Sequence, residues 1–156
     1  MGLLDFIKKV THQDSPSTRE LKTEVFLVRG ASYYRNNIGK LACSNPDWKC
    51  TAAQVLSAGK VDKRIYRYNY INKPVKLIEE PSNKHDKNAV AVLIAGEVVG
   101  YIGRDENIHV KSILKLGEIK YISSFISGGQ YKVISKDKEI ERFEEEISIK
   151  VKIAYI

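Results

Sequence analysis

A polar turn at residues 81–88, with the sequence PSNKHDKN, carries more chemistry than a turn needs. Proline and asparagine suit a reversal of the backbone. His85, Asp86 and the two lysines are not required for one. A carboxylate accepts hydrogen bonds, an imidazole can donate or accept them, and lysines attract anionic ligands. We therefore expect this turn to form part of a binding site.

The residues that follow the turn predict the scaffold that holds it. Residues 89–94 are an apolar run with several β-branched members, which is typical of a buried strand. Residues 95–97 reverse the chain into a second apolar segment, 98–102. The resulting hairpin would place Tyr101 and Arg104 at the same end as the polar turn. Functional loops on a rigid scaffold are a common way to build a site.

Two other interpretations of the turn stay open. Asn83 and Asp86 would merely brace it if their side chains bonded to nearby backbone N–H groups. His85 beside Asp86, together with Asp105 or His109, would suggest a small metal-dependent nuclease. Adjacent side chains rarely orient each other productively, and a two-metal site needs more carboxylates than are clustered here. We therefore expect a protein without catalytic activity.

Composition indicates an ordinary globular protein. Of the 156 residues, 43% are hydrophobic and 29% are charged, and no window resembles a membrane span or a signal peptide. We expect a cytoplasmic protein without a cofactor. Cys43 and Cys50 lie near no histidine with metal-ligand spacing, so free thiols are the favoured state.

Charge is unevenly distributed along the chain. Five glutamates and one arginine give residues 139–146 a charge of −4, which leaves +11 for the rest of a chain whose net charge is +7. A basic body suits a partner that carries phosphates. The acidic segment and the N-terminal residues could instead dock a protein partner, so an interaction module without nucleic-acid binding is the alternative function.

The chain divides into a short N-terminal segment and one domain. Residues 3–10 have apolar side chains at helical spacing, and residues 11–18 are polar and include a proline. We expect residues 1–20 to form a short amphipathic helix and a linker, and residues 21–156 to form one domain.

Alternating polar and apolar residues predict most of the strands of that domain. Strands are expected at residues 22–29, 64–71, 119–126, 131–135 and 147–155, with residues 127–130 as a hairpin turn. The second of these would align Arg64, Tyr66, Tyr68 and Tyr70 on one face, either packed against a neighbouring strand or free as a second stacking surface.

Two short helices complete the expected domain. One lies at residues 46–59 with Asp47 or Thr51 as N-cap, and the other runs from an Asp105 cap to Leu116. Residues 30–37 are expected to be a polar aromatic loop. Six or so strands with two short helices predict a mainly β, α+β fold with a small curled sheet or barrel.

The residues around the turn also resemble a known family. The pattern is Glu80-Pro81-x-Asn83-x-x-Asp86-x-Asn88-Ala89-Val90-x-Val92, then Gly96 and Gly100-Tyr101-Ile102, and it resembles the HIRAN domain. Val28-x-Gly30-x-x-Tyr33-Tyr34 looks like that family's opening strand and aromatic loop. The resemblance covers residues 24–127 and indicates a free-standing member of the bacterial or phage type.

The resemblance implies a partly open, OB-like β-barrel that binds single-stranded DNA and captures its 3′-hydroxyl end, acting in DNA repair, replication or mobile-element biology. It implies that Tyr33 and Tyr34 contact terminal bases, that Asn83 and Asp86 bond the terminal sugar and hydroxyl, and that Tyr101 and Arg104 contact bases or phosphate. Two positions depart from the family pattern. Ser32 replaces a phosphate-pairing arginine, a role that Arg29 or Arg35 would take over, and His85 replaces a stacking tyrosine.

Overall fold

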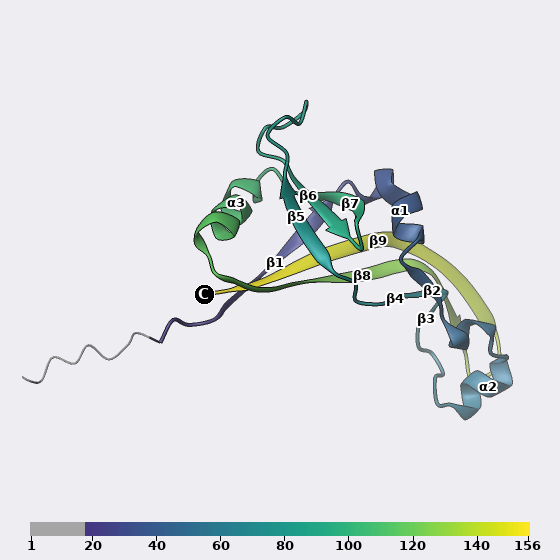
Figure 1. The fold of residues 1–156 in the computed structure, drawn as a ribbon. Helices are drawn as coiled ribbons and strands as arrows, with labels where there is room; N and C mark the ends of the chain where they lie inside the picture. Colours follow the sequence, from purple (N-terminus) through teal and green to yellow (C-terminus); the bar gives the residue numbers. More distant parts are fainter. Residues whose placement is uncertain (1–17) are drawn as a thin grey trace, which may run out of the picture.

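The computed structural model describes residues 18–156. The helix expected at residues 3–10 and nearly all of the linker after it lie outside the described residues. The fold of the remaining chain is drawn in Figure 1.

Antiparallel strands dominate the fold. The strands of the main sheet are β1 (Lys22–Arg29), β3 (Ile65–Tyr66), β5 (Val75–Glu79), β6 (Val90–Ile94), β7 (Glu97–Ile102), β8 (Ile119–Ile134) and β9 (Ile140–Tyr155). They form one seven-stranded sheet in the order β3-β8-β9-β1-β7-β6-β5, and β2 (Ala42–Ser44) pairs with β4 (Tyr68–Tyr70) in a separate ribbon. The expected mainly β, α+β class is confirmed, and the sheet is curved but not closed into a barrel.

Residues 18–156 contain three short α-helices and two 3₁₀ turns. They are α1 (Arg35–Gly39), α2 (Ala52–Ser57) and α3 (Asn107–Leu116), with 3₁₀ turns η2 (Ala31–Tyr34) and η3 (Pro46–Lys49). The loop expected at residues 30–37 is therefore wrong. Gly30 adopts a left-handed φ of 76° and its carbonyl accepts the Tyr33 N–H at 3.0 Å, which starts a helical turn instead.

The expected caps are right at one helix and wrong at the other. Thr51 caps α2 in a reciprocal capping box with Gln54. Asp105 does not cap α3: the N-cap is Glu106, without a side-chain hydrogen bond, and the N–H groups of Glu106 and Asn107 bond the Gly103 carbonyl. The helix expected at residues 46–59 is interrupted, because Cys50 and Thr51 are extended between η3 and α2.

The single strand expected at residues 64–71 is also wrong, because Arg67 interrupts it. Arg67 donates its N–H to Gln130 on β8, and its carbonyl accepts from Asn45. On one side of this break β3 pairs with β8, and on the other β4 pairs with β2. Of the four side chains that strict alternation would align, Tyr66 lies on β3, Tyr68 and Tyr70 lie on β4, and Arg64 precedes β3.

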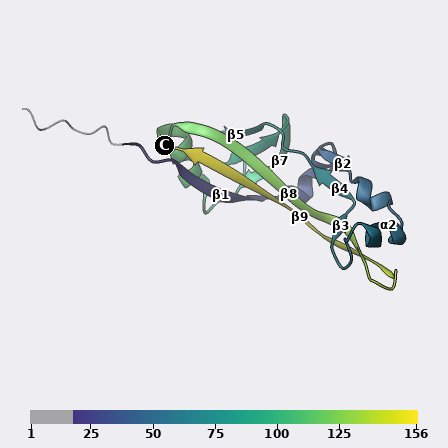
Figure 2. The same cartoon turned by 90° about the horizontal axis from the view of Figure 1, so that it is seen from below.

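The hairpin expected at residues 127–130 is a bulge inside β8. Gly128 and Gly129 take φ values of 102° and 89°, and the register against β9 shifts between Ser127 and Gly129. A Cβ on Gly128 would lie 2.2 Å from the carbonyl oxygen of Glu146, so glycine is needed there. β8 and β9 consequently form one long, curved hairpin, which extends away from α3 in Figures 1 and 2.

Two hydrophobic clusters stabilise this shape. The larger one joins buried side chains of β1, β6, β7 and β9 with Ile38 of α1 and with Val110 and Ile113 of α3. The smaller one, made of Val55, Ile65 and Ile134, packs α2 against the far part of the β8–β9 hairpin. Between β1 and β5, η2 and α1 thus pack with the main cluster, whereas α2 and β3 pack at the far part of the hairpin.

Gly100 of the Gly-Tyr-Ile motif is required by close strand packing. A Cβ there would lie 2.4 Å from the carbonyl oxygen of Arg29 and 2.5 Å from Cγ1 of Val28, both on β1. The residue next to it, Tyr101, is paired in register with Arg29. The contact between β7 and β1 therefore fixes the strand that carries the tyrosine of the motif.

We predict that Gly100→Ala lowers the free energy of unfolding by about 1–3 kcal/mol, because β1 and β7 must separate to admit the methyl group. Urea denaturation would measure the change. Gly39→Ala is the matched control, since its Cβ would meet nothing within 4 Å. Equal stability of the two variants would contradict the close approach.

Candidate nucleic-acid interface

The polar turn connects β5 to β6 and is closed by backbone hydrogen bonds. The Glu80 N–H donates to the Ala89 carbonyl at 2.9 Å, and the Ala89 N–H donates to the Asp86 carbonyl at 3.0 Å. The Asn83 N–H donates to the Glu80 carbonyl at 3.0 Å. These bonds give the segment a defined shape before any side chain contributes.

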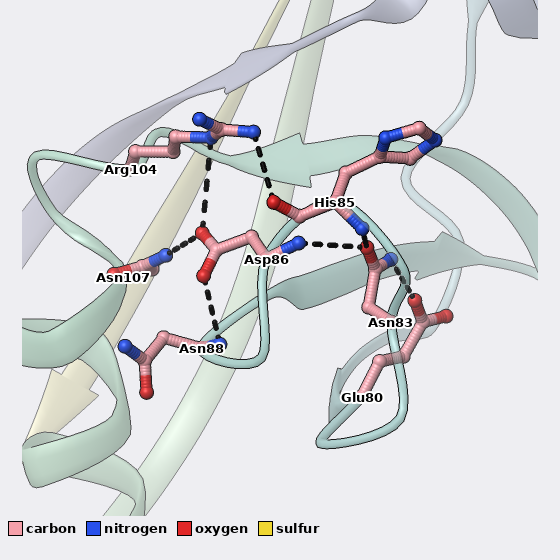
Figure 3. Close-up of polar contacts among 7 residues, drawn as sticks. All are labelled: Glu80, Asn83, His85, Asp86, Asn88, Arg104 and Asn107. Atoms are coloured by element: carbon pink, nitrogen blue, oxygen red, sulfur yellow. Dashed lines mark hydrogen bonds and ion pairs between the residues drawn. The ribbon is translucent and has the colours of Figure 1, made fainter.

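Asn83 organises the first half of the turn with its side chain (Figure 3). Its Oδ1 accepts the N–H groups of His85 at 2.9 Å and Asp86 at 3.1 Å. Its Nδ2 donates to Glu80 Oε2 at 2.9 Å. One amide thus satisfies two backbone donors and one carboxylate oxygen, which is an Asx-type brace.

Asp86 joins the second half of the turn to α3. Its Oδ1 accepts the Asn88 N–H at 2.8 Å, and its Oδ2 accepts Asn107 Nδ2 at 2.8 Å. Asn107 is only 2% exposed, and its Oδ1 has no hydrogen-bond partner among residues 18–156. Arg104 makes a longer contact with the same carboxylate, because its Nε lies 4.0 Å from Asp86 Oδ2. Its Nη2 donates a hydrogen bond to the His85 carbonyl at 3.1 Å.

The bracing hydrogen bonds considered for Asn83 and Asp86 are therefore present in the structure. They leave free acceptor positions on Asp86, because a carboxylate offers roughly four lone-pair positions and two hydrogen bonds from residues 18–156 occupy two of them, beside the longer ion pair with Arg104. The Asp86 side chain keeps 21% of its surface exposed. Bracing and ligand contact are thus compatible for this residue.

Tyr101 links the turn to the aromatic segment at η2. Its hydroxyl donates to Glu80 Oε2 at 3.1 Å. Its ring lies 6.2 Å from that of Tyr34, centroid to centroid, with the planes tilted by 50°. Contacts therefore run without interruption from Tyr34 through Tyr101, Glu80 and Asn83 to Asp86.

Burial holds the Tyr101 hydroxyl in its protonated form. Loss of solvent contact raises the pKa of Tyr101 well above its usual value, and contacts with Tyr34 and Glu80 raise it further. A tyrosine is ordinarily protonated at physiological pH, and the raised pKa keeps this phenol a hydrogen-bond donor to Glu80 at higher pH as well.

The remaining predicted site residues lie at the surface. Tyr33 is 88% exposed, and Arg35 is exposed at the start of α1. His85 is also exposed, and Figure 3 shows its ring pointing away from the Asp86 carboxylate. The structure thus brings Tyr34, Tyr101, Asn83, Asp86 and Arg104 together. Tyr33, Arg35 and the His85 ring make no side-chain bond to that group among the described residues.

Sequence reasoning assigned no role to two residues of this network, Glu80 and Asn107. Glu80 appeared only as part of the motif, although its carboxylate joins Tyr101 to Asn83. Asn107 shares the buried face of α3 with Val110 and Ile113. An asparagine at an apolar-face position of an amphipathic helix is the signal that could have identified it.

Three further features of the described residues concern metal ligands, cysteines and membrane-spanning helices. Within residues 18–156, no group of three or more His, Cys, Asp or Glu side chains is placed to hold a metal ion. Cys43 and Cys50 are free thiols. None of the helices described is long and apolar enough to cross a membrane.

Comparison with known proteins identifies the family. The model of the HIRAN domain matches residues 49–152, two thirds of the chain, including the polar turn, the β6–β7 hairpin and α3 but not Tyr33 or Tyr34. No curated protein matches the sequence. A crystal structure of a Lactobacillus plantarum protein from the Northeast Structural Genomics Consortium is 14% identical, covering 88% of this chain and 100% of that one, with a TM-score of 0.38.

We predict that Asp86→Ala lowers the free energy of unfolding by about 1–3 kcal/mol, because the buried Asn107 amide and the Asn88 N–H lose their acceptor. Chemical denaturation would measure the loss. Asp137→Ala, in the exposed turn between β8 and β9, removes the same charged group and is expected to change stability by less than about 0.5 kcal/mol. If both variants unfold like the wild type, the Asp86–Asn107 bond does not hold the turn.

Proposed function

This chain belongs to the HIRAN domain family, and we propose that it is a non-catalytic module that binds single-stranded DNA and captures the 3′-hydroxyl end. Members of the family generally bind single-stranded DNA or its 3′ ends. The observation that carries the proposal is the continuous line of contacts from Tyr34 to Asp86, which places an aromatic wall and a half-buried carboxylate in one network.

Stacking supplies affinity for bases of any sequence. Each base stacked on an aromatic ring contributes about 1–3 kcal/mol. Tyr33 offers such a ring, because it is 88% exposed and next to the fixed Tyr34. His85 offers a smaller exposed ring at the polar turn.

Asp86 supplies the preference for a terminus. A 3′-hydroxyl can donate to a free lone pair of this carboxylate, whereas a 3′-phosphate would bring a second negative charge to it. The carboxylate is already oriented by Asn88 and Asn107, so binding would not require it to be reordered. Asn83 and Asp86 then act as both brace and receptor.

Basic side chains near the same strands would follow the phosphates. Arg29 is paired with Tyr101 across β1 and β7, so its side chain emerges on the same face of the sheet. It is the better placed substitute for the arginine that Ser32 replaces, with Arg104 at the turn and Arg35 on α1 as further contacts. Such contacts make affinity fall as salt rises.

The proposal assigns this module to processes that generate free 3′ ends, namely DNA repair, replication or mobile-element biology. It requires no cofactor. We further propose that a protein partner brings it to DNA.

We predict that short oligonucleotides ending in a 3′-hydroxyl bind about tenfold or more tightly than the same strands ending in 3′-phosphate or 3′-deoxyribose. A hydrogen bond to a charged group contributes about 1.5–3 kcal/mol, which corresponds to that factor. Fluorescence anisotropy with 5′-labelled strands at two salt concentrations would measure it. Equal affinity for the three termini would contradict end capture.

Variants separate the two parts of this site. Asp86→Asn, studied below its melting temperature, should remove the preference for a 3′-hydroxyl end over the other two termini. Tyr33→Ala should lower the affinity for all three strands by the same factor. Tyr121→Ala is the control for Tyr33, because it removes another exposed tyrosine, from β8. A Tyr33 variant that binds like the wild type would remove this ring from the interface.

A further inference from the structure

A second aromatic and basic surface lies at the far part of the β8–β9 hairpin, where η3 packs against it. Two hollows of about 580 Å³ and 340 Å³ adjoin there and share Trp48 and Arg67 in their walls. Figure 1 draws this end of the hairpin near α2, away from the polar turn between β5 and β6. The hollows therefore belong to a different region from the candidate end-binding site.

Basic side chains of the hairpin lie against Trp48. Lys132, only 4% exposed, donates from Nζ to the Trp48 carbonyl at 2.7 Å and lies 5.3 Å from the centre of the indole ring. Arg142, paired with Lys132 across β8 and β9, places its Cζ 5.9 Å from the same ring. Contacts of this kind limit the orientations of the ring, which lowers the entropic cost of stacking on a base.

The two arginines beside Trp48 form no ion pair among the described residues, although Arg142 lies within the acidic segment 139–146. Arg67 donates to Gln130 Oε1 at 2.7 Å, and its Cζ lies 5.3 Å from the Tyr68 ring. Among residues 18–156, neither Arg67 nor Arg142 has a carboxylate within ion-pair distance. Glu144 is the one carboxylate among the residues that line the two hollows.

We propose that this surface is a second binding site for single-stranded nucleic acid, in which Trp48 stacks on a base and Arg67 and Arg142 bind the neighbouring phosphates. Aromatic rings interleaved with guanidinium groups are the features by which proteins hold single strands without reading sequence, and Trp48 is partly exposed here. Tyr68, 40% exposed beside Arg67, offers a ring for an adjacent base.

The shape of the surface favours a strand over the other anionic ligands. Two adjoining hollows suit successive nucleotides, and an isolated mononucleotide would fill only one of them. An acidic peptide would meet the same arginines but has no base to place on Trp48. The inference rests on the proposed single-strand binding. In it, this surface binds the internal nucleotides of the strand, and its affinity does not depend on the chemistry of the terminus.

Trp48 is the only tryptophan of the chain, so its intrinsic fluorescence reports on this site alone. We predict that oligothymidylate of about 12 nucleotides, within the site sizes of single-strand binders, quenches this emission in a saturable manner. An abasic strand of equal length, and polyglutamate of equal charge, should not quench it. A 3′-phosphate on oligothymidylate should leave the quenching unchanged.

Variants test the arginines without removing the fluorophore. Arg67→Gln with Arg142→Gln should weaken the quenching titration about tenfold, and Glu144→Gln should strengthen it. Arg64→Gln is the matched control: this arginine directly precedes β3 and contacts the same hairpin, but it pairs with Glu145 and covers Tyr131 instead of lining the hollows. Thermal unfolding of each variant identifies any loss of fold.

The outcomes distinguish this inference from the proposed end capture. Absence of quenching by oligothymidylate while anisotropy still detects end-dependent binding would overturn the second site and leave the first intact. Quenching that is the same for all termini, without any preference in anisotropy, would support the second site and contradict end capture. Equal quenching by polyglutamate would show an acidic-peptide site and overturn the inference.

Discussion

The hydrogen bond between the Asp86 carboxylate and the buried Asn107 amide is the constraint on which the candidate site depends. It ties a surface turn to a helix whose own buried face belongs to the main hydrophobic cluster. Without it, a carboxylate on a ten-residue connection between two strands would sample many orientations, and ordering it would cost free energy at each binding event. A receptor for a small hydroxyl group needs this kind of preorganisation.

Backbone packing extends the same constraint across the sheet. The absence of a side chain at Gly100 lets β7 approach β1, and this approach brings Tyr101 beside Arg29. Tyr101 in turn connects Tyr34 to the turn through Glu80. The bulge at Gly128 and Gly129 acts at the other end, where it allows β8 and β9 to continue as one hairpin that carries Trp48's neighbours Lys132 and Arg142. Glycines at close contacts thus shape both surfaces.

The sequence was a good guide where local pattern decides structure and a poor one where distant partners do. Residues 22–29 and the strands flanking the Ala95–Gly96 reversal were predicted, since apolar patterning and turn chemistry are local. Ser127–Gln130 looked like a hairpin because two glycines favour a turn, yet pairing with β9 over the whole length outweighs that preference. The alternation at residues 64–71 was real, but different partner strands divide it. Asp86 could be singled out from its motif. Asn107 could be recognised as a polar residue on the apolar face of α3, but not as the partner of Asp86, because only tertiary packing brings the two together.

An NMR titration tests the central claim most directly, because the Asn107 side-chain NH₂ group donates to the carboxylate proposed to receive the 3′-hydroxyl. On addition of a short 3′-hydroxyl strand, this signal and the backbone amides of Asn83 and Asp86 should shift together and saturate together. The same strand ending in 3′-phosphate should leave the Asn107 side-chain signal nearly unchanged. Identical shifts with both strands, or shifts that spare Asn107, Asn83 and Asp86, would contradict end capture at this turn.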